Sequence, residues 1–147
     1  MIFREATTAD IPQIQIVRNS VKENTLSDRA LVPDKDVEDY INNRGKGWVC
    51  LVNDTVVGIA IVSVIDYNVW ALFIQHGYEG KGIGKKLHDK MMEWYFSQTH
   101  QPIWLATDPG TRAEKFYRKA GWKEVGTLEK GEIKFEMRWN EWDIGHG

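Results

Sequence analysis

A glycine-rich run in the middle of the chain has the residue types of an anion site. Gly80-Lys81-Gly82-Ile83-Gly84 places three glycines at alternate positions, and Lys85 and Lys86 follow directly. Glycine lets a backbone approach a ligand closely and turn its N–H groups inward. Where such a run opens a helix, the first amides and the helix dipole favour a bound anion, most often phosphate. The sequence therefore predicts a phosphate-binding loop.

The lysines of this run support the same interpretation. Lys81, Lys85 and Lys86 crowd the expected positive end of a helix, where each cation costs about 0.3–1 kcal/mol. A bound polyanion would reverse that sign. The alternative is a solvated helix start in which the glycines serve packing, because glycine patterns alone give false matches. Three glycines within five residues favour the anion site.

Two common phosphate motifs do not fit the run. The spacing from Gly77 to Gly82 is that of a Walker A motif, but Ile83 stands where that motif requires lysine. The dinucleotide pattern Gly-x-Gly-x-x-Gly fails at Lys85 when it starts from Gly80, and at Leu87 when it starts from Gly82. The run therefore belongs neither to a P-loop NTPase nor to a standard Rossmann site.

The elements around the run must hold it in place. The pattern predicts a strand over Val69–Ile74, the glycine-rich loop, and a long helix to about Thr99. The apolar positions of that helix have the spacing of one face: Ile83, Leu87, Met91, Trp94 and Tyr95. We expect His88, on this helix, and His100, after it, at the surface.

The rest of the chain predicts a mixed order of strands and helices. Strands are expected at 2–5, 48–52, 55–65, 103–106, 123–128 and 132–139, and helices from about residue 9, from residue 34 and over 111–120. Asn53-Asp54 is expected to turn a hairpin. Thr111 and Glu114 have the spacing of a capping box, and Gly121 ends that helix. This order predicts one α/β or α+β sheet domain over residues 1–147.

Composition narrows the class of protein. The chain has 147 residues, 42% hydrophobic and 27% charged, which is typical of one globular domain. A net charge of −2 gives no electrostatic case for nucleic acid. A single cysteine, Cys50, excludes a disulfide framework and a cysteine-based zinc site, so no metal is expected. Without a signal peptide or an apolar run near ~18 residues, we expect a cytoplasmic protein with no membrane partner.

Two stretches of the chain resemble one family. The run from Ile74 to Leu87 is similar to the acetyl-CoA loop of the GNAT N-acetyltransferase superfamily, whose pattern is Gln/Arg-x-x-Gly-x-Gly/Ala after the fourth strand. The run from Ala113 to Trp122 resembles that family's second motif, Ala-x-x-Phe-Tyr-x-x-x-Gly-Phe. The order and separation of the two motifs match the family as well, and so does the expected order of elements.

The resemblance implies a fold and a co-substrate. The fold would be the acyl-CoA N-acyltransferase fold, a splayed, mainly antiparallel mixed sheet with about four helices. Acetyl-CoA would lie where the sheet splays, between the strands Val69–Ile74 and Ile103–Ala106. The residues implied to bind it are Ile74, His76, Gly80, Lys81, Gly82, Ile83, Gly84 and Lys85.

The resemblance also implies a reaction. The acetyl group would pass directly from acetyl-CoA to a primary amine of a small amine, an amino acid or a peptide. Tyr117 matches the tyrosine that protonates the leaving thiolate, and a phenol with a pKa near 10 is protonated at neutral pH. The alternative for Tyr117 is a ring packed in the core, which is how we interpret Phe116.

The general base stays open. An amine with a pKa near 10 is mostly ammonium at neutral pH and must lose a proton before it attacks. Asn68 stands about where some members carry a glutamate base, so the resemblance assigns no base here. Among nearby residues we rank Asp66 first and keep three other candidates: His76, Glu132 and Glu136. Asp66 also suits a turn, the two glutamates suit a strand surface, and a water relay is equally open. Glu79 replaces the family's Gln or Arg, so we expect its carboxylate to point away from phosphate.

Other functions remain as alternatives. The same fold serves a non-catalytic CoA-binding or regulatory module. A third hypothesis is an interaction protein that contacts its partner through a Trp139/Trp142 tail and exposed edge strands. The resemblance makes a homodimer a reasonable expectation, with the strand Glu132–Trp139 as an edge. We expect the stretch Asn24–Pro33, with Trp48 and Trp70, to line the acceptor pocket, and core packing is the alternative for both tryptophans.

Overall fold

The structure, a computed structural model, describes residues 1–21 and 32–146, which fall into two compact units. The first unit contains residues 1–21 and 32–99, and the described part of the second runs from 100 to 146. The first unit comprises β1 (Ile2–Glu5), the 3₁₀ turn η1 (Thr8–Asp10), α1 (Ile11–Ser20), α2 (Asp34–Asp39), the short helix η2 (Tyr40–Arg44), β2 (Gly45–Val52), β3 (Thr55–Ser63), β4 (Asn68–Ile74) and α3 (Ile83–Gln98).

The sheet of the first unit is antiparallel throughout, in the order β1-β2-β3-β4. The expected hairpin joins β2 to β3. Its central residues, Asn53 and Asp54, both have positive φ, 51° and 62°. A two-residue hairpin turn with positive φ at both residues has a twist that matches that of the paired strands. Apart from glycine, Asn and Asp are the residues that adopt this left-handed conformation most readily. The local sequence is therefore sufficient to place this turn.

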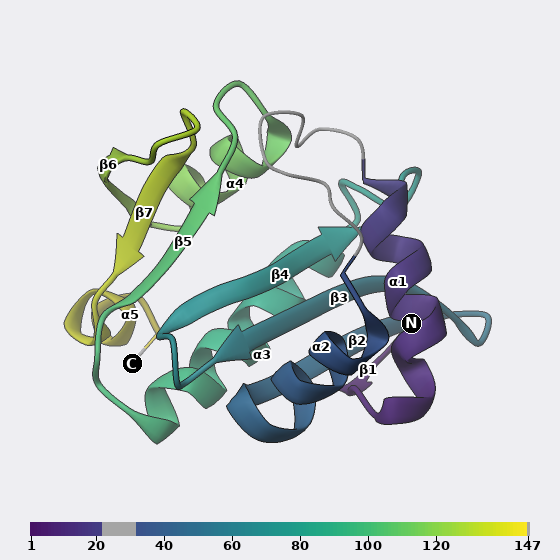
Figure 1. The fold of residues 1–147 in the computed structure, drawn as a ribbon. Coiled ribbons are helices and arrows are strands. Elements are labelled where there is room, and N and C mark those ends of the chain that lie inside the picture. The colour runs from purple at the N-terminus through teal and green to yellow at the C-terminus, as the bar shows by residue number, and fades with distance from the viewer. Residues whose placement is uncertain (22–31, 147) are drawn as a thin grey trace. The chain divides into compact units, whose positions relative to one another are not determined.

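Helices cover both faces of this sheet (Figure 1). Ile59 and Ile61 of β3 pack with Ile14 and Val17 of α1 in one buried cluster. Gly58 points to the opposite face, where an added Cβ would lie 2.9 Å from Leu87 Cδ1 of α3. The first turns of α3 therefore press directly on the sheet, which fixes where the preceding loop must run.

Strand β3 ends at Ser63, two residues earlier than expected. The Ser63 hydroxyl accepts the backbone N–H groups of Ile65 (3.2 Å) and Asp66 (2.9 Å), and donates to Asp66 Oδ2 (3.0 Å). A serine side chain that captures the next amides offers the backbone an alternative to the ladder. The chain therefore turns at once, and β4 begins at Asn68.

The second unit contains β5 (Ile103–Thr107), α4 (Arg112–Lys119), β6 (Lys123–Thr127), β7 (Ile133–Met137) and α5 (Trp139–His146). Its strands are antiparallel in the order β5-β7-β6. β7 pairs with β5 on one side and β6 on the other, and its residues Ile133, Phe135 and Met137 are buried. The expectation of an edge strand over Glu132–Trp139 is therefore wrong for this unit, where β6 flanks β7.

Trp139 belongs to α5 and not to the last strand, a second correction. The Arg138 N–H donates to Glu141 Oε1 at 2.9 Å, and the Trp142 N–H donates to the Arg138 carbonyl at 3.1 Å. These bonds start a helix directly after Met137, because the Glu141 carboxylate satisfies an amide that the helix leaves unpaired. The alternation of apolar and polar residues that predicts the strand therefore extends through Trp139 without marking where the strand ends.

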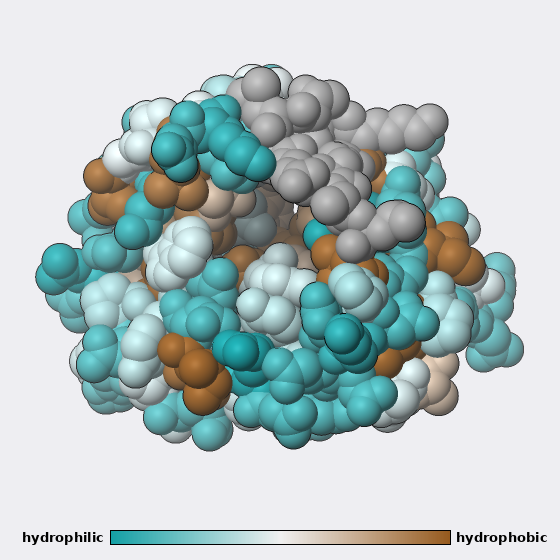
Figure 2. Space-filling view, viewed as in Figure 1, coloured by the Kyte–Doolittle hydropathy of each residue, from teal (hydrophilic) through white to brown (hydrophobic). Residues whose placement is uncertain are grey.

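Polar side chains dominate the face shown in Figure 2, where hydrophobic residues form small separate groups. Ile16, Ile65 and Ile144 are examples of exposed aliphatic residues. Among the described residues, no helix has the length and apolar character needed to cross a membrane.

Candidate functional site

The loop between β4 and α3 leaves the sheet in a defined turn. Ile74, half-buried at the end of β4, pairs with Gly58. The Gln75 N–H donates to the Val57 carbonyl at 2.8 Å, and the Tyr78 N–H donates to the Gln75 carbonyl at 3.0 Å. The loop is therefore anchored to β3 at its start.

Gly80 and Gly82 have the backbone geometry that only glycine adopts readily. Their φ angles are +75° and +82°. A Cβ added at either position would meet nothing within 4 Å among the described residues. Close packing therefore does not explain these glycines. They leave open space beside a backbone that a ligand can approach.

The N-terminus of α3 has no cap of its own. Its N-cap residue, Gly82, lacks a side-chain hydrogen bond, and no acidic residue lies in the first turn. The first helical bond runs from the Lys86 N–H to the Gly82 carbonyl at 3.2 Å. The amides just before Lys86 have no intrahelical partner, as at every helix start. They point outward at the positive end of the helix dipole.

The lysines at this end are held by neighbours within the unit. Lys85 Nζ lies 2.6 Å from Asp89 Oδ2, and Lys86 Nζ lies 5.4 Å from the centre of the Phe3 ring. Burial raises the pKa of Asp89, but hydrogen bonds from His88 and Lys85 outweigh it and lower the pKa to about 2. Asp89 therefore remains a carboxylate and keeps Lys85 beside the first turn.

His88 is buried, contrary to the expectation of a surface position. Only 2% of it is exposed, and its Nδ1 lies 3.0 Å from Asp89 Oδ1. The signal was present in the sequence, because position 88 lies three and four residues before Met91 and Met92, on the buried face of α3. His100 is exposed, as expected, and stacks on Trp139 at 4.2 Å.

The Glu79 carboxylate turns back to the start of the loop. Its Oε1 accepts the Gly77 N–H at 2.7 Å, and its Oε2 lies 3.4 Å from His76 Nδ1. The His76 side chain is 91% exposed. Sequence reasoning identified Glu79 as a departure from the family but missed its partner, since the backbone direction of Gly77 is not visible in a one-dimensional pattern.

Helix α4 in the second unit has a side-chain cap at its N-terminus. Thr111 Oγ1 accepts the Glu114 N–H at 3.2 Å, the first half of the expected capping box. The Glu114 carboxylate accepts the Gly110 N–H at 2.7 Å, one residue before the amide that a capping box would use. Arg118 and Lys119 occupy the last turn. Charges at both ends therefore suit the helix dipole.

Tyr117 lies on the buried face of α4. It is 6% exposed and meets Trp122 edge-on at 5.6 Å and Phe116 edge-on at 5.3 Å. Burial raises the pKa of its phenol above the ordinary value. The phenol therefore keeps its proton at neutral pH, as a proton donor must. The packed-ring interpretation is equally compatible with these contacts, and the glycine-rich loop belongs to the other unit.

Asp66 sits in the turn between β3 and β4, held by several neighbours. Besides the Ser63 hydroxyl, Arg44 lies 3.2 Å from Asp66 Oδ2. The Asp66 side chain is 39% exposed. These contacts fit the turn role well, and the catalytic role of Asp66 stays a prediction.

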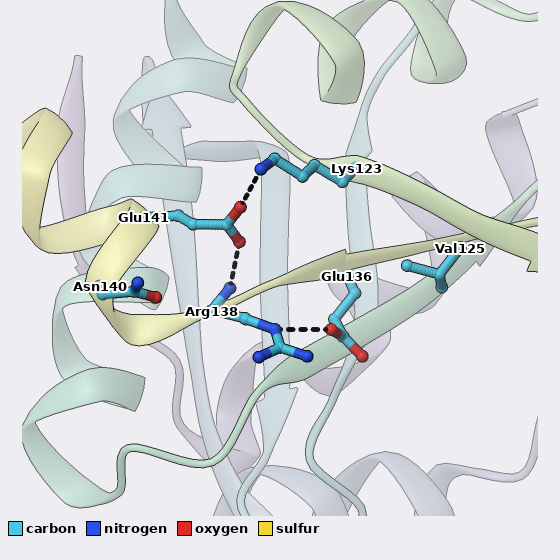
Figure 3. Close-up of a pocket in the computed structure, with 6 residues that line it drawn as sticks. All are labelled: Lys123, Val125, Glu136, Arg138, Asn140 and Glu141. Carbon is cyan, nitrogen blue, oxygen red and sulfur yellow. Dashed lines mark hydrogen bonds and ion pairs between the residues drawn. The ribbon is translucent and has the colours of Figure 1, made fainter.

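A cavity in the second unit does not coincide with any residue predicted to bind acetyl-CoA. It measures about 410 Å³ and is lined by Lys123, Val125, Glu136, Arg138, Asn140 and Glu141 (Figure 3). Its polar groups already pair with one another: Glu141 accepts from Lys123 Nζ at 2.6 Å, and Arg138 Nε lies 3.4 Å from Glu136. Glu136, one candidate base, is therefore tied into this network.

The two tryptophans proposed for the acceptor pocket differ in setting. Trp48 is buried and meets Trp94 of α3 edge-on at 5.8 Å, which supports core packing. Trp70 is half-buried and stacks on Tyr40 at 4.0 Å, with the Arg18 guanidinium 5.9 Å from its ring. Most of the stretch Asn24–Pro33 lies outside the described residues. In the part of the chain described, no three His, Cys, Asp or Glu side chains are grouped to hold a metal.

Comparison with solved structures shows a shared fold. A PaiA N-acetyltransferase from Thermoplasma acidophilum in complex with coenzyme A matches with a TM-score of 0.80 and 16% identity over 94% of this chain and 98% of that one. A ribosomal-protein-alanine N-acetyltransferase from Brucella melitensis gives 0.76 and 22% over 94% and 99%. A GNAT-family acetyltransferase from Staphylococcus aureus Mu50 gives 0.78 and 23% over 93% and 98%.

The sequence comparisons identify the family. Among proteins with curated descriptions, none matches this chain. The sequence pattern of the acetyltransferase (GNAT) family matches residues 14–122, well over half of the chain, and contains both the glycine-rich loop and Tyr117. The mixed α/β fold with mainly antiparallel strands is the one that the resemblance implied. The chain belongs to the GNAT family of acetyltransferases.

Proposed function

We propose that this protein is an N-acetyltransferase that moves an acetyl group from acetyl-CoA to a primary amine. The observation that carries the proposal is the start of α3. There an uncapped helix end, three lysines and open space beside Gly80 and Gly82 occur together. Each feature alone has a structural explanation. Together they favour a ligand with several negative charges.

Coenzyme A fits this donor set. Its pyrophosphate would accept from the backbone amides between Gly80 and Lys85, with Lys81 and Lys85 beside it. Ile74 would offer its strand-end backbone to the pantetheine, and exposed His76 would lie along the same loop. The PaiA N-acetyltransferase of similar fold was solved with coenzyme A, which supports the assignment by analogy.

In the reaction, acetyl-CoA supplies the acetyl group as a thioester. The amine nitrogen forms a bond to the acetyl carbon, the carbon–sulfur bond breaks, and the electron pair leaves with sulfur. Tyr117, which burial keeps protonated, would donate its phenolic proton to that sulfur. The amine proton would pass to a base. Among the side chains on this chain Asp66 stays our first candidate, with a water relay beside it.

A thermal shift experiment tests the co-substrate. Acetyl-CoA at about 100 times its Kd should raise the free energy of unfolding by roughly 2.7 kcal/mol. ATP and NAD at the same concentration serve as controls and should give a smaller shift. A protein that ignores CoA and acetyl-CoA at millimolar concentration would refute the assignment.

Thiol release with a panel of amines separates catalysis from binding. Amines, amino acids, polyamines, aminoglycosides and peptides should be screened with acetyl-CoA. Turnover with at least one amine supports the enzyme. Tight CoA binding without turnover across the panel would favour the alternative, a CoA-binding or regulatory module.

We propose further that residues 1–147 act as one domain. We also propose that the protein forms a homodimer, and light scattering at several concentrations would test this oligomeric state.

A further inference from the structure

Glu79 is the one acidic residue within the glycine-rich loop from Gly77 to Gly84. Its Oε1 accepts the Gly77 N–H at 2.7 Å, the short distance of a charge-assisted hydrogen bond. Its side chain is 27% exposed, against 91% for His76, whose Nδ1 lies 3.4 Å from Oε2. The shorter bond to the Gly77 amide therefore defines the position of this carboxylate better than the longer contact with the exposed histidine does.

Gly77 needs such a partner. Its φ is +99°, and a Cβ there would meet nothing within 4 Å among the described residues, so packing does not hold it. Glycine loses more conformational freedom on ordering than any other residue. The Tyr78 N–H bond to Gln75 closes the turn on one side, and the Glu79 carboxylate closes it on the other. Glu79 thus fixes the path by which the chain enters the loop.

Charge alone argues against a carboxylate at this position. Lys81, Lys85 and Lys86 make the loop positive, and an acid would weaken its attraction for phosphate. The hydrogen bond to Gly77 gives the residue a different use, because it draws the carboxylate back toward the start of the loop. Two effects of Glu79 therefore oppose each other: its acceptor atom orders the loop, and its charge repels the ligand.

We propose that Glu79 is a positioning residue for coenzyme A. Its oxygen holds the Gly77 amide so that the amides from Gly80 to Lys85 stay aimed at the pyrophosphate, and the acceptor atom matters more than the charge. The inference rests on the proposed function, since it deepens the use of the same loop.

Two substitutions separate the acceptor from the charge. Glu79→Gln keeps an oxygen that can accept the Gly77 N–H and removes the charge, whereas Glu79→Ala removes both. In titration calorimetry with CoA, Glu79→Gln should bind at least as tightly as the parent, and Glu79→Ala should bind about three- to tenfold more weakly. If both variants bound CoA more tightly than the parent, the charge of Glu79 alone would determine its effect on CoA affinity. If both stayed within twofold, Glu79 would have no role. Either result overturns the proposal.

Glu93 offers a matched control on the exposed side of α3. Glu93→Gln removes the same charge from the same unit without touching the loop, and CoA affinity should stay within twofold. In steady-state kinetics Glu79→Ala should raise KM for acetyl-CoA and leave kcat within twofold, because it touches no reacting atom. A fall in kcat with unchanged KM would contradict a positioning role.

A measurement without ligand keeps the inference independent of the cofactor assignment. Amide hydrogen exchange at Gly77 and Tyr78 should be faster in Glu79→Ala and close to the parent in Glu79→Gln. Unchanged exchange in Glu79→Ala would show that the carboxylate does not order the loop. If the parent protein failed to bind CoA at all, the proposed function would fall, while this exchange experiment would still decide whether Glu79 holds Gly77.

Discussion

The two helix starts that follow glycine-containing loops are built in opposite ways. α4 begins at a threonine cap, carries Glu114 in its first turn, and pairs that acid with Arg118 one turn later at 2.9 Å. α3 begins at an uncapped glycine and carries Lys85 in its first turn, paired with Asp89 one turn later at 2.6 Å. The spacing of the two ion pairs is the same, but their polarity is reversed.

Physical chemistry assigns different uses to the two arrangements. An acid before a base suits the helix dipole, and the reverse order opposes it. α4 therefore has a cap within its own chain, because the Thr111 side chain accepts the Glu114 N–H. α3 has neither a side-chain cap nor an acidic residue for its first amides, and Lys85 and Lys86 lie in this turn. The two helix starts therefore differ in whether the chain itself supplies a cap.

Tyr117 gives the largest effect that we expect. α3 and α4 each bury a tyrosine beside a phenylalanine, with ring centres 5.1 Å apart for Tyr95–Phe96 and 5.3 Å for Phe116–Tyr117. Tyr117→Phe should keep the packing and lower kcat by about 10²–10⁴-fold, toward the lower end because a thiolate is already a fair leaving group.

Tyr95→Phe is the control for that experiment, since it removes a buried hydroxyl on α3 without touching the proposed acid. Both variants should be followed by thermal unfolding and by turnover under conditions where chemistry limits the rate. Equal turnover in the parent and Tyr117→Phe would make Tyr117 a packing residue.

Replacing Gly82 tests the open helix start. Gly82→Val forces a β-branched residue to a φ of +82° and fills the space beside the loop. Backbone strain of this kind lowers the free energy of unfolding by about 1–3 kcal/mol. In the variant that remains folded, CoA affinity should fall roughly tenfold or more. Gly110→Val applies the same strain, at φ +77°, to the loop before α4. Calorimetry should show a smaller loss of CoA affinity there. Equal losses of CoA affinity in the two variants would contradict a specific role for the loop before α3.

Reversing the charge at Lys85 should act mainly on binding. Lys85→Glu places a carboxylate where α4 has one, which suits the helix dipole but opposes Asp89 and any bound phosphate. We expect CoA affinity to drop roughly tenfold while stability changes by less than about 1 kcal/mol. Lys119→Glu, in the last turn of α4, changes net charge equally and should leave affinity within twofold. A similar drop in CoA affinity for Lys119→Glu would mean that net charge alone explains the weaker binding of Lys85→Glu.

Asp89 makes the smallest and most acid-dependent contribution. Its folded pKa of about 2 lies below the ordinary 3.8, so its stabilising effect is complete above pH 3.8 and is lost as the pH falls toward 2. After a discount for solvent screening this amounts to about 1 kcal/mol. Asp89→Asn should therefore be less stable than the parent at pH 7 in urea unfolding, with the gap closing near pH 2. A gap that stayed constant from pH 7 to pH 2 would mean that the ion pair carries no stability.

Features encoded over a few residues were predictable from the sequence. The Asn53-Asp54 turn, the Thr111 cap and the stop at Gly121 each depend on local backbone preferences, and all three occur as expected. The positive φ of Gly80 and Gly82 agrees with the glycine-rich loop that the sequence predicts before α3, and its role in binding phosphate stays a prediction.

Features that depend on where a side chain reaches were not predictable. Glu114 bonds the Gly110 amide, and Ser63 ends β3 by capturing amides two and three residues ahead. Both choices follow from backbone directions that form only when the chain folds. His88 was missed for a different reason, since its polarity outweighed its position on the buried face of α3.

Cys50 lies fully buried in β2, and burial raises the pKa of its thiol. Since thiol reagents react with the thiolate, the folded chain should be silent toward them at neutral pH. In a colorimetric assay every equivalent of colour then reports coenzyme released by turnover, with no correction for the enzyme. The same reagent in denaturant should count one thiol per chain, so one dye reads both catalysis and unfolding.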